Sequence, residues 1–135
     1  MNSRKQFGLS ADERIKSRKD FEKIFTSGKV VYSPDKKIRA VYLVTEEIER
    51  GVKIAAVVSK KAGNAVWRNR VKRLIKEVYR LNKQILTDLS LQKNISIKVA
   101  FSPNLMNEKN FKDVKLNDVK TGIIDVMFKI KSILQ

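Results

Sequence analysis

Apolar and polar positions follow a helical spacing between residues 65 and 82. The apolar positions are Trp67, Val71, Leu74, Ile75, Val78 and Leu81, at successive spacings of four, three, one, three and three residues. This spacing predicts an amphipathic helix, which we expect from about Ala65 to Asn82 with an extension toward Leu86. Asn64 precedes the pattern and suits an N-cap, because its side-chain oxygen can accept a backbone N–H of the first turn.

The remaining pattern predicts a further six elements. A helix is expected at Arg18–Ser27, with Ser17 as its N-cap and Gly28 as its C′ residue. Alternating or continuous apolar runs predict strands at 30–32, 38–45, 52–58 and 95–101, and a last helix is expected at 117–133. Residues 46–51 read as a charged hairpin connection, and residues 1–16 as an extended basic arm.

The order of these elements is α-β-β-β-α-β-α. It predicts one α/β (α+β sandwich) domain over residues 1–135, with helices packed on a mixed four-stranded sheet. The third strand, the basic helix and the fourth strand would form a crossover unit.

The net charge of the chain is the most informative feature of its composition. The chain has 30 Lys and Arg against 14 Asp and Glu, a net charge of +16. A folded domain with this self-repulsion indicates a polyanionic partner, and an apolar content of 42% excludes a disordered basic tail. The sequence has no apolar run of about 18 residues and its N-terminus lacks a signal-peptide core, so we expect a soluble cytoplasmic protein.

The basic helix concentrates this charge on one face. Opposite its apolar stripe lie Arg68, Asn69, Lys72, Arg73, Lys76 and Arg80. Arg68 and Arg70 fall in the first turns, where the helix dipole disfavours cations. Phosphates at that end would make the placement favourable. The alternative is a solvated basic face with no ligand.

Catalytic chemistry is not supported by the residue types present. The chain has no histidine and no cysteine, which removes the usual general acid–base group and most zinc sites. Its acidic residues show no spacing typical of a paired-metal nuclease. We therefore predict no catalytic residue and no metal-binding residue.

Residues 59–73 read S-K-K-A-G-N-A-V-W-R-N-R-V-K-R. This run resembles the signature of the bacterial ribonuclease P protein subunit, close to S-K-K-x-G-N-A-V-x-R-N-R-x-K-R. Residues 14–28 resemble the N-terminal helix of the same family, with an aromatic pair at Phe21 and Phe25. The resemblance covers most of residues 12–102 and implies a ribosomal-protein-like topology with an unusual left-handed β-α-β crossover.

The resemblance also implies a function. In this family the RNA subunit performs hydrolysis with its own Mg²⁺ ions. The protein binds that RNA and precursor tRNA and aids endonucleolytic maturation of the tRNA 5′ end. No tightly bound cofactor, membrane or protein partner is implied. The residues expected to contact the catalytic RNA are Lys60, Lys61, Asn64, Arg68, Asn69, Arg70, Lys72, Arg73 and Lys76.

A second surface is implied by the same resemblance. Phe21, Phe25 and Tyr42 match aromatic positions that line a cleft for the single-stranded 5′ leader of precursor tRNA. Bases that stack on such rings are held without regard to sequence. The alternative is core packing, which is the more common role of aromatics spaced i, i+4 on a helix.

Some features depart from the family or stay open. Phe101 stands where the family has an arginine in an A-R-x-P-like run, so that contact is lost unless Phe101 stacks instead. Residues 104–115 form a longer segment than usual, with no role assigned. Trp67 is expected in the core, whereas Tyr79 could face either way. Competing functions are a ribosomal or general RNA-binding protein and a basic amphipathic module for anionic membranes.

Overall fold

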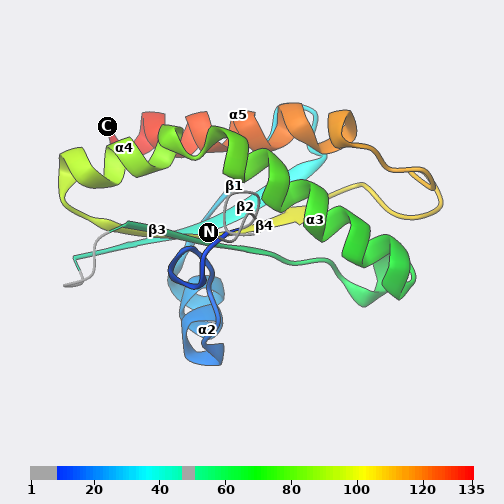
Figure 1. Ribbon diagram of the computed structural model, residues 1–135, viewed down its shortest axis with the longest axis horizontal. Coiled ribbons are helices and arrows are strands. Elements are labelled where there is room, and N and C mark those ends of the chain that lie inside the picture. Colours follow the sequence, from blue (N-terminus) through cyan, green and yellow to red (C-terminus); the bar gives the residue numbers. More distant parts are fainter. Residues whose placement is uncertain (1–8, 47–50) are drawn as a thin grey trace, which may run out of the picture.

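The computed structural model describes residues 9–46 and 51–135 and contains a sheet with helices on both faces (Figure 1). The elements in chain order are α2 (Arg18–Ser27), β1 (Lys29–Tyr32), β2 (Ile38–Thr45), β3 (Gly51–Ala56), α3 (Ala65–Asn82), α4 (Gln84–Lys93), β4 (Ser96–Pro103) and α5 (Leu116–Leu134). Short 3-10 turns, η1 (Ala11–Glu13) and η2 (Lys60–Ala62), precede α2 and α3. The predicted mixed α/β class is confirmed.

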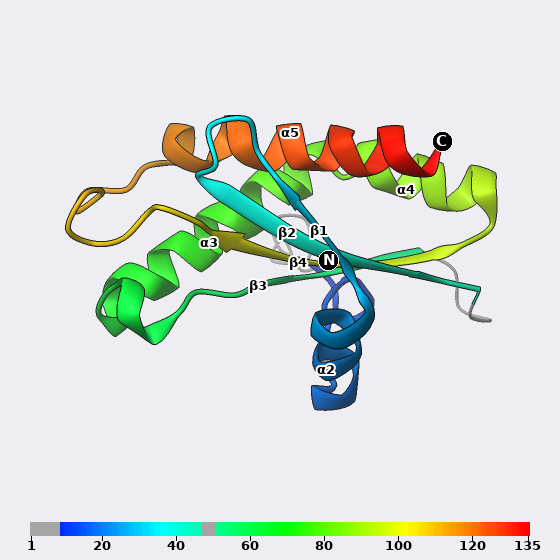
Figure 2. The ribbon, with the colours of Figure 1, turned by 180° about the vertical axis from the view of Figure 1, so that it is seen from behind.

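The strands form a four-stranded sheet in the order β1-β2-β4-β3. β4 pairs antiparallel with β2 and parallel with β3, so the chain crosses over through α3 and α4 between the two parallel strands. This confirms the crossover unit, while its left-handed sense stays a prediction. Helices α3, α4 and α5 cover one face and α2 projects from the other, as the two opposite views show (Figures 1 and 2).

Strand alternation divides the core between these two faces. In β2, Ile38, Ala40 and Tyr42 point into the larger core beneath α3, α4 and α5. Val41 points the other way, into a smaller core under α2 that also contains Ile15, Ile24, Ala55 and Ala100. The sheet is therefore well covered on one side and only partly covered on the other.

Helix α2 is fixed to the sheet by an ion pair and by a close backbone approach. Lys98 on β4 is buried and its Nζ lies 3.4 Å from the Asp20 carboxylate. Ser17 caps the helix as predicted, since its Oγ accepts from the Asp20 N–H at 3.4 Å. Gly28 ends it in an extended conformation (φ −75°), not the left-handed one that a C′ glycine usually adopts.

Two expectations about chain connections were wrong. A separate helix, α4, occupies residues expected to be mostly loop, because Leu86 and Leu89 are buried there against the sheet and α5. Residues 46–51 do not join a hairpin, since β4 lies between β2 and β3; positions 47–50 fall outside the described residues.

The predicted N-terminal arm is docked over its described part. The Ile15 N–H donates to the Ile54 carbonyl at 2.9 Å, and the Ile15 side chain is buried in the smaller core. Glu13 forms an ion pair with Lys83 at 3.0 Å. Residues 1–8 lie outside the described residues.

Gly28 should be intolerant of any side chain. A Cβ there would clash with the Ile24 carbonyl oxygen. It would also lie 2.8 Å from Val41 Cγ1 and 2.9 Å from the backbone carbonyl oxygen of Tyr42. We expect Gly28→Ala to lower the free energy of unfolding by about 1–3 kcal/mol, the usual cost of overpacking. Urea denaturation measures this, with the exposed neighbour Ser27→Ala as the control. Equal stability of both variants would contradict the packing described here.

Candidate nucleic-acid interface

The start of α3 is held by a network centred on Asn64. Its Oδ1 accepts the Trp67 N–H at 2.8 Å, which confirms the predicted N-cap. Its backbone N–H and its Nδ2 donate to the two carboxylate oxygens of Glu108, at 2.9 and 3.0 Å. Both side-chain heteroatoms of Asn64 are thus engaged within the protein, and its contact with RNA stays a prediction.

Exposed cations precede and follow this network along the chain. Lys60 and Lys61 lie on η2, and Arg70 and Arg73 lie in the first half of α3, all with exposed side chains. Asn69 is exposed beside them. Among the described residues, no acidic side chain forms an ion pair with any of these four cations. Their charge is therefore free to attract an anionic partner.

Three other members of the predicted set are partly buried. Arg68 donates from Nε to the Gly63 carbonyl at 3.1 Å, so part of its side chain supports the turn before α3. Lys72 and Lys76 lie farther along the same face. Burial, with the nearby charges of Arg14 and Lys72, holds the pKa of Lys76 below its usual range. An anion at this point would relieve the crowding of positive charge.

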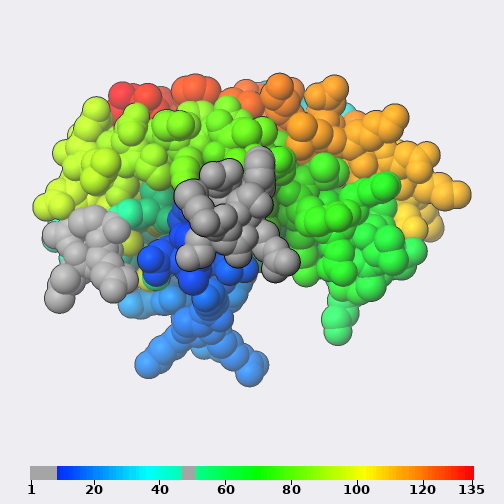
Figure 3. All heavy atoms as spheres, in the orientation of Figure 1, coloured from blue at the N-terminus to red at the C-terminus, as the bar shows by residue number. Residues whose placement is uncertain are grey.

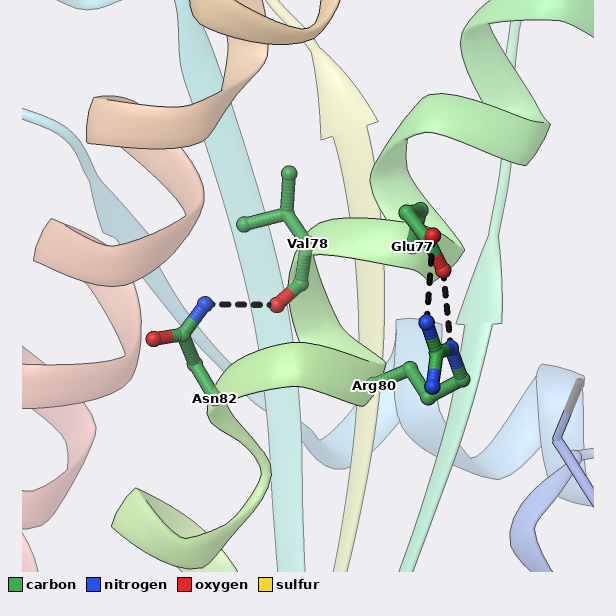
Figure 4. Close-up of polar contacts among 4 residues, drawn as sticks. All are labelled: Glu77, Val78, Arg80 and Asn82. Atoms are coloured by element: carbon green, nitrogen blue, oxygen red, sulfur yellow. Dashed lines mark hydrogen bonds and ion pairs between the residues drawn. The ribbon is translucent and has the colours of Figure 1, made fainter. Parts of the chain in front are cut away.

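The basic face ends near the last turn of α3 (Figure 4). Arg80 forms a forked pair with Glu77, with Nε–Oε1 and Nη2–Oε2 distances of 2.8 and 3.1 Å. This hydrogen bond holds the pKa of Glu77 below its usual range. Asn82 donates from Nδ2 to the Val78 carbonyl at 2.8 Å. The face of α3 that remains open to an anionic partner therefore lies before Glu77.

The apolar face of α3 differs from its prediction at one turn. Trp67, Val71, Ile75 and Val78 are buried as expected, but Leu81 is 56% exposed. Tyr79 takes the core position instead, fully buried, with its ring centroid 6.2 Å from that of Phe101.

Phe101 cannot replace the family's arginine by stacking on a ligand. Its side chain is fully buried in the larger core, beneath α3 and α5. The suggestion that it stacks at the surface was therefore wrong.

The three aromatics expected in one cleft are not brought together. Phe21 packs against the smaller core under α2, and Phe25 on the same helix is 47% exposed. Tyr42 is 3% exposed and faces the larger core on the opposite side of the sheet, where burial raises the pKa of its hydroxyl. The grouping with Tyr42 is corrected, because the alternation of β2 places it away from α2.

The sheet face beside α2 presents other residues that the sequence reasoning missed. Tyr32 on β1 pairs in register with Arg39 on β2, and Val30 pairs with Val41, which lies in the core under α2. Tyr32 and Arg39 therefore share the face from which α2 projects. Figure 3 shows α2 and the region where α3 begins projecting from the same side of the molecule, with a hollow between them. Counting alternate positions along β2 from Val41 identifies Arg39, whereas Tyr32 on β1 follows only from the pairing register.

Neither a metal cluster nor a membrane-spanning helix is found in residues 9–46 and 51–135. No group of three or more Asp and Glu side chains in that part is placed to hold a metal ion. No helix there is long and apolar enough to cross a membrane.

Comparison with known proteins identifies the family of this chain. A profile of the family described as Ribonuclease P matches residues 9–121. The ribonuclease P protein component of Porphyromonas gingivalis is 39% identical over 105 residues, which cover 75% of this chain and 74% of that protein. That of Alkaliphilus metalliredigens is 29% identical, covering 93% and 99%.

Solved structures share the fold. The ribonuclease P protein of Thermotoga maritima superposes with a TM-score of 0.69 at 22% identity, covering 87% of this chain and 96% of that one. The Staphylococcus aureus protein gives 0.66 at 24% identity, covering 91% and 98%. The profile match, together with the sequence identity to the curated relatives, shows that the chain belongs to the ribonuclease P protein family, the RNA-binding protein components of a tRNA-processing ribonucleoprotein.

Proposed function

We propose that this chain binds the RNA subunit of ribonuclease P through the start of α3 and the 5′ leader of precursor tRNA through the open sheet face beside α2. The RNA subunit would perform the hydrolysis with Mg²⁺, and the protein would raise affinity for the substrate. The observation that supports this most directly is the group of exposed cations Lys60, Lys61, Arg70 and Arg73, which form no ion pair with any acid in the described part of the chain.

Phosphate recognition suits the chemistry at the start of α3. Guanidinium and ammonium groups there can each contact backbone phosphates, which gives affinity with little base specificity. The helix dipole adds partial positive charge at the same end. A structured RNA with closely spaced phosphates fits such a cluster better than a single small anion.

Leader binding is supported by the arrangement beside α2. Phe25 offers an exposed ring on α2, and Tyr32 and Arg39 lie on the sheet face from which α2 projects. Single-stranded bases stack on aromatic rings while cations hold the backbone, so one surface accepts leaders of any sequence. The position of Tyr32 on this face makes it, and not Tyr42, the sheet aromatic proposed for the contact.

The first experiment is cleavage of precursor tRNA by a bacterial ribonuclease P RNA at low Mg²⁺, with and without this protein. We expect strong stimulation with the cut at the mature 5′ end. Tight RNA binding without stimulation would favour a general structural RNA-binding role. Cleavage by the protein alone would overturn the assignment of hydrolysis to RNA.

Removing two cations at the start of α3 should weaken RNA binding in a salt-dependent way. For Arg70→Ala with Arg73→Ala, we expect lower affinity for the RNA subunit and a log–log salt slope smaller in magnitude by about 0.7–1 per lost phosphate contact. Filter binding over a range of KCl concentrations measures both quantities.

A charge-matched variant controls for net charge. Lys93→Ala with Lys120→Ala removes two exposed cations from α4 and α5. This variant should keep most of the affinity, because its charges lie on other helices. Equal losses in both double variants would show that only overall charge matters.

Phe25 provides the cleanest test of leader stacking. Phe25→Ala should remove about 1–3 kcal/mol of the affinity gained from a 5′ leader, with little loss of stability, because the ring is 47% exposed. The measurement compares precursor tRNA with mature tRNA in the reconstituted enzyme. Phe128→Ala on α5, where the side chain is 50% exposed, is the matched control. An unchanged leader contribution in Phe25→Ala would remove Phe25 from the proposed surface.

A further inference from the structure

We propose that Glu108 is a positioning residue for the RNA-contacting start of α3. It belongs to residues 104–115, the segment between β4 and α5. The inference rests on the proposed RNA contact at α3 and adds to it the device that holds this contact in place. No other role has been assigned to the segment.

The contacts of Glu108 all converge on the turn that precedes α3. Its two carboxylate oxygens accept from the Asn64 N–H at 2.9 Å and from Asn64 Nδ2 at 3.0 Å. Its own backbone N–H donates to the Ala62 carbonyl at 2.7 Å. A Cβ on Gly63 would lie 2.9 Å from Glu108 Cβ and 2.8 Å from Trp67 Cε3, so the fit leaves no space for a side chain there.

The rest of the segment is anchored independently. The Trp67 indole Nε1 donates to the Phe111 carbonyl at 2.8 Å. Asn104 donates to the Lys37 carbonyl from its backbone and to the Lys36 carbonyl from its side chain, both at 2.6 Å. Met106 is buried at 4% exposure. Glu108 thus lies in a segment that is held to the rest of the protein by hydrogen bonds and a buried side chain.

The charge of Glu108 makes its placement informative. The carboxylate binds Asn64, with Lys60 and Lys61 shortly before it and Arg68 shortly after it in the chain, so electrostatics alone predicts that Glu108 weakens binding of an RNA phosphate nearby. The hydrogen bonds of Glu108 predict that it strengthens RNA binding, because they fix the turn that lies between these cations in the chain. Arg68 depends on that turn directly, since its Nε donates to the Gly63 carbonyl.

Removing the carboxylate should therefore strengthen RNA binding if its electrostatic repulsion dominates, and weaken RNA binding if its hydrogen bonds to the turn dominate. We expect Glu108→Ala to weaken binding of the ribonuclease P RNA by about fivefold, the factor that one net hydrogen bond represents, although it makes the protein more positive. Glu108→Gln should recover part of the loss, since its amide oxygen can still accept the Asn64 N–H. Asp113→Ala removes an exposed acid from the same segment and should bind as tightly as the parent or more tightly.

The fluorescence of Trp67 distinguishes a change in this turn from a general loss of stability, because lower stability alone does not alter the emission spectrum of the folded protein. It is the single tryptophan of the chain and packs directly beside Gly63 and Glu108. Its emission spectrum in the folded state should shift in Glu108→Ala, shift less in Glu108→Gln and stay unchanged in Asp113→Ala. Far-UV circular dichroism fixes the folded fraction used for each affinity.

The failure of this proposal is separable from failure of the RNA contact itself. RNA binding by folded Glu108→Ala that equals or exceeds that of Asp113→Ala overturns the positioning role, while the effect of Arg70→Ala with Arg73→Ala still tests the contact. Should Glu108→Ala not fold, Glu108→Gln decides the matter: parent-like RNA affinity together with a shifted Trp67 spectrum would overturn the proposal.

Discussion

The parallel pairing of β3 with β4 is the constraint on which the rest of this structure depends. Parallel neighbours cannot be joined by a tight turn, so the chain must return through α3 and α4 across one face of the sheet. That return puts the start of α3 at the end of the sheet where β4 finishes. The segment after β4 consequently meets the turn before α3, and Glu108 reaches Asn64 although 44 positions separate them.

Ion pairing then decides which charges remain available. Several acids are engaged inside the protein: Glu13 with Lys83, Asp20 with Lys98, Glu77 with Arg80, and Glu108 with Asn64. The exposed cations at the start of α3 are left without such partners among the described residues. A chain with this excess of positive charge thus presents part of it where α3 begins, on the side of the molecule from which α2 projects.

The two tyrosines Tyr32 and Tyr42 show how the position of a residue in a strand decides which face of the sheet its side chain occupies. Tyr42 and Tyr32 both lie in strands that flank the open face, but alternation sends Tyr42 into the larger core and Tyr32 to the side of Arg39. Resemblance to a family motif selected Tyr42 by its neighbours in sequence. The pairing register between β1 and β2 was needed to select Tyr32.

The sequence by itself determined the helices of strong period, α2, α3 and α5, the caps at Ser17 and Asn64, the strand segments and the basic face, because these follow from local spacing and side-chain chemistry. It did not determine α4, where a weakly amphipathic stretch is helical because Leu86 and Leu89 find a core. Nor did it show that residues 9–16 dock along β3, that β4 lies between β2 and β3, or that Glu108 holds the start of α3. These features depend on contacts between distant segments, which local pattern cannot specify and which only the packed tertiary structure brings together.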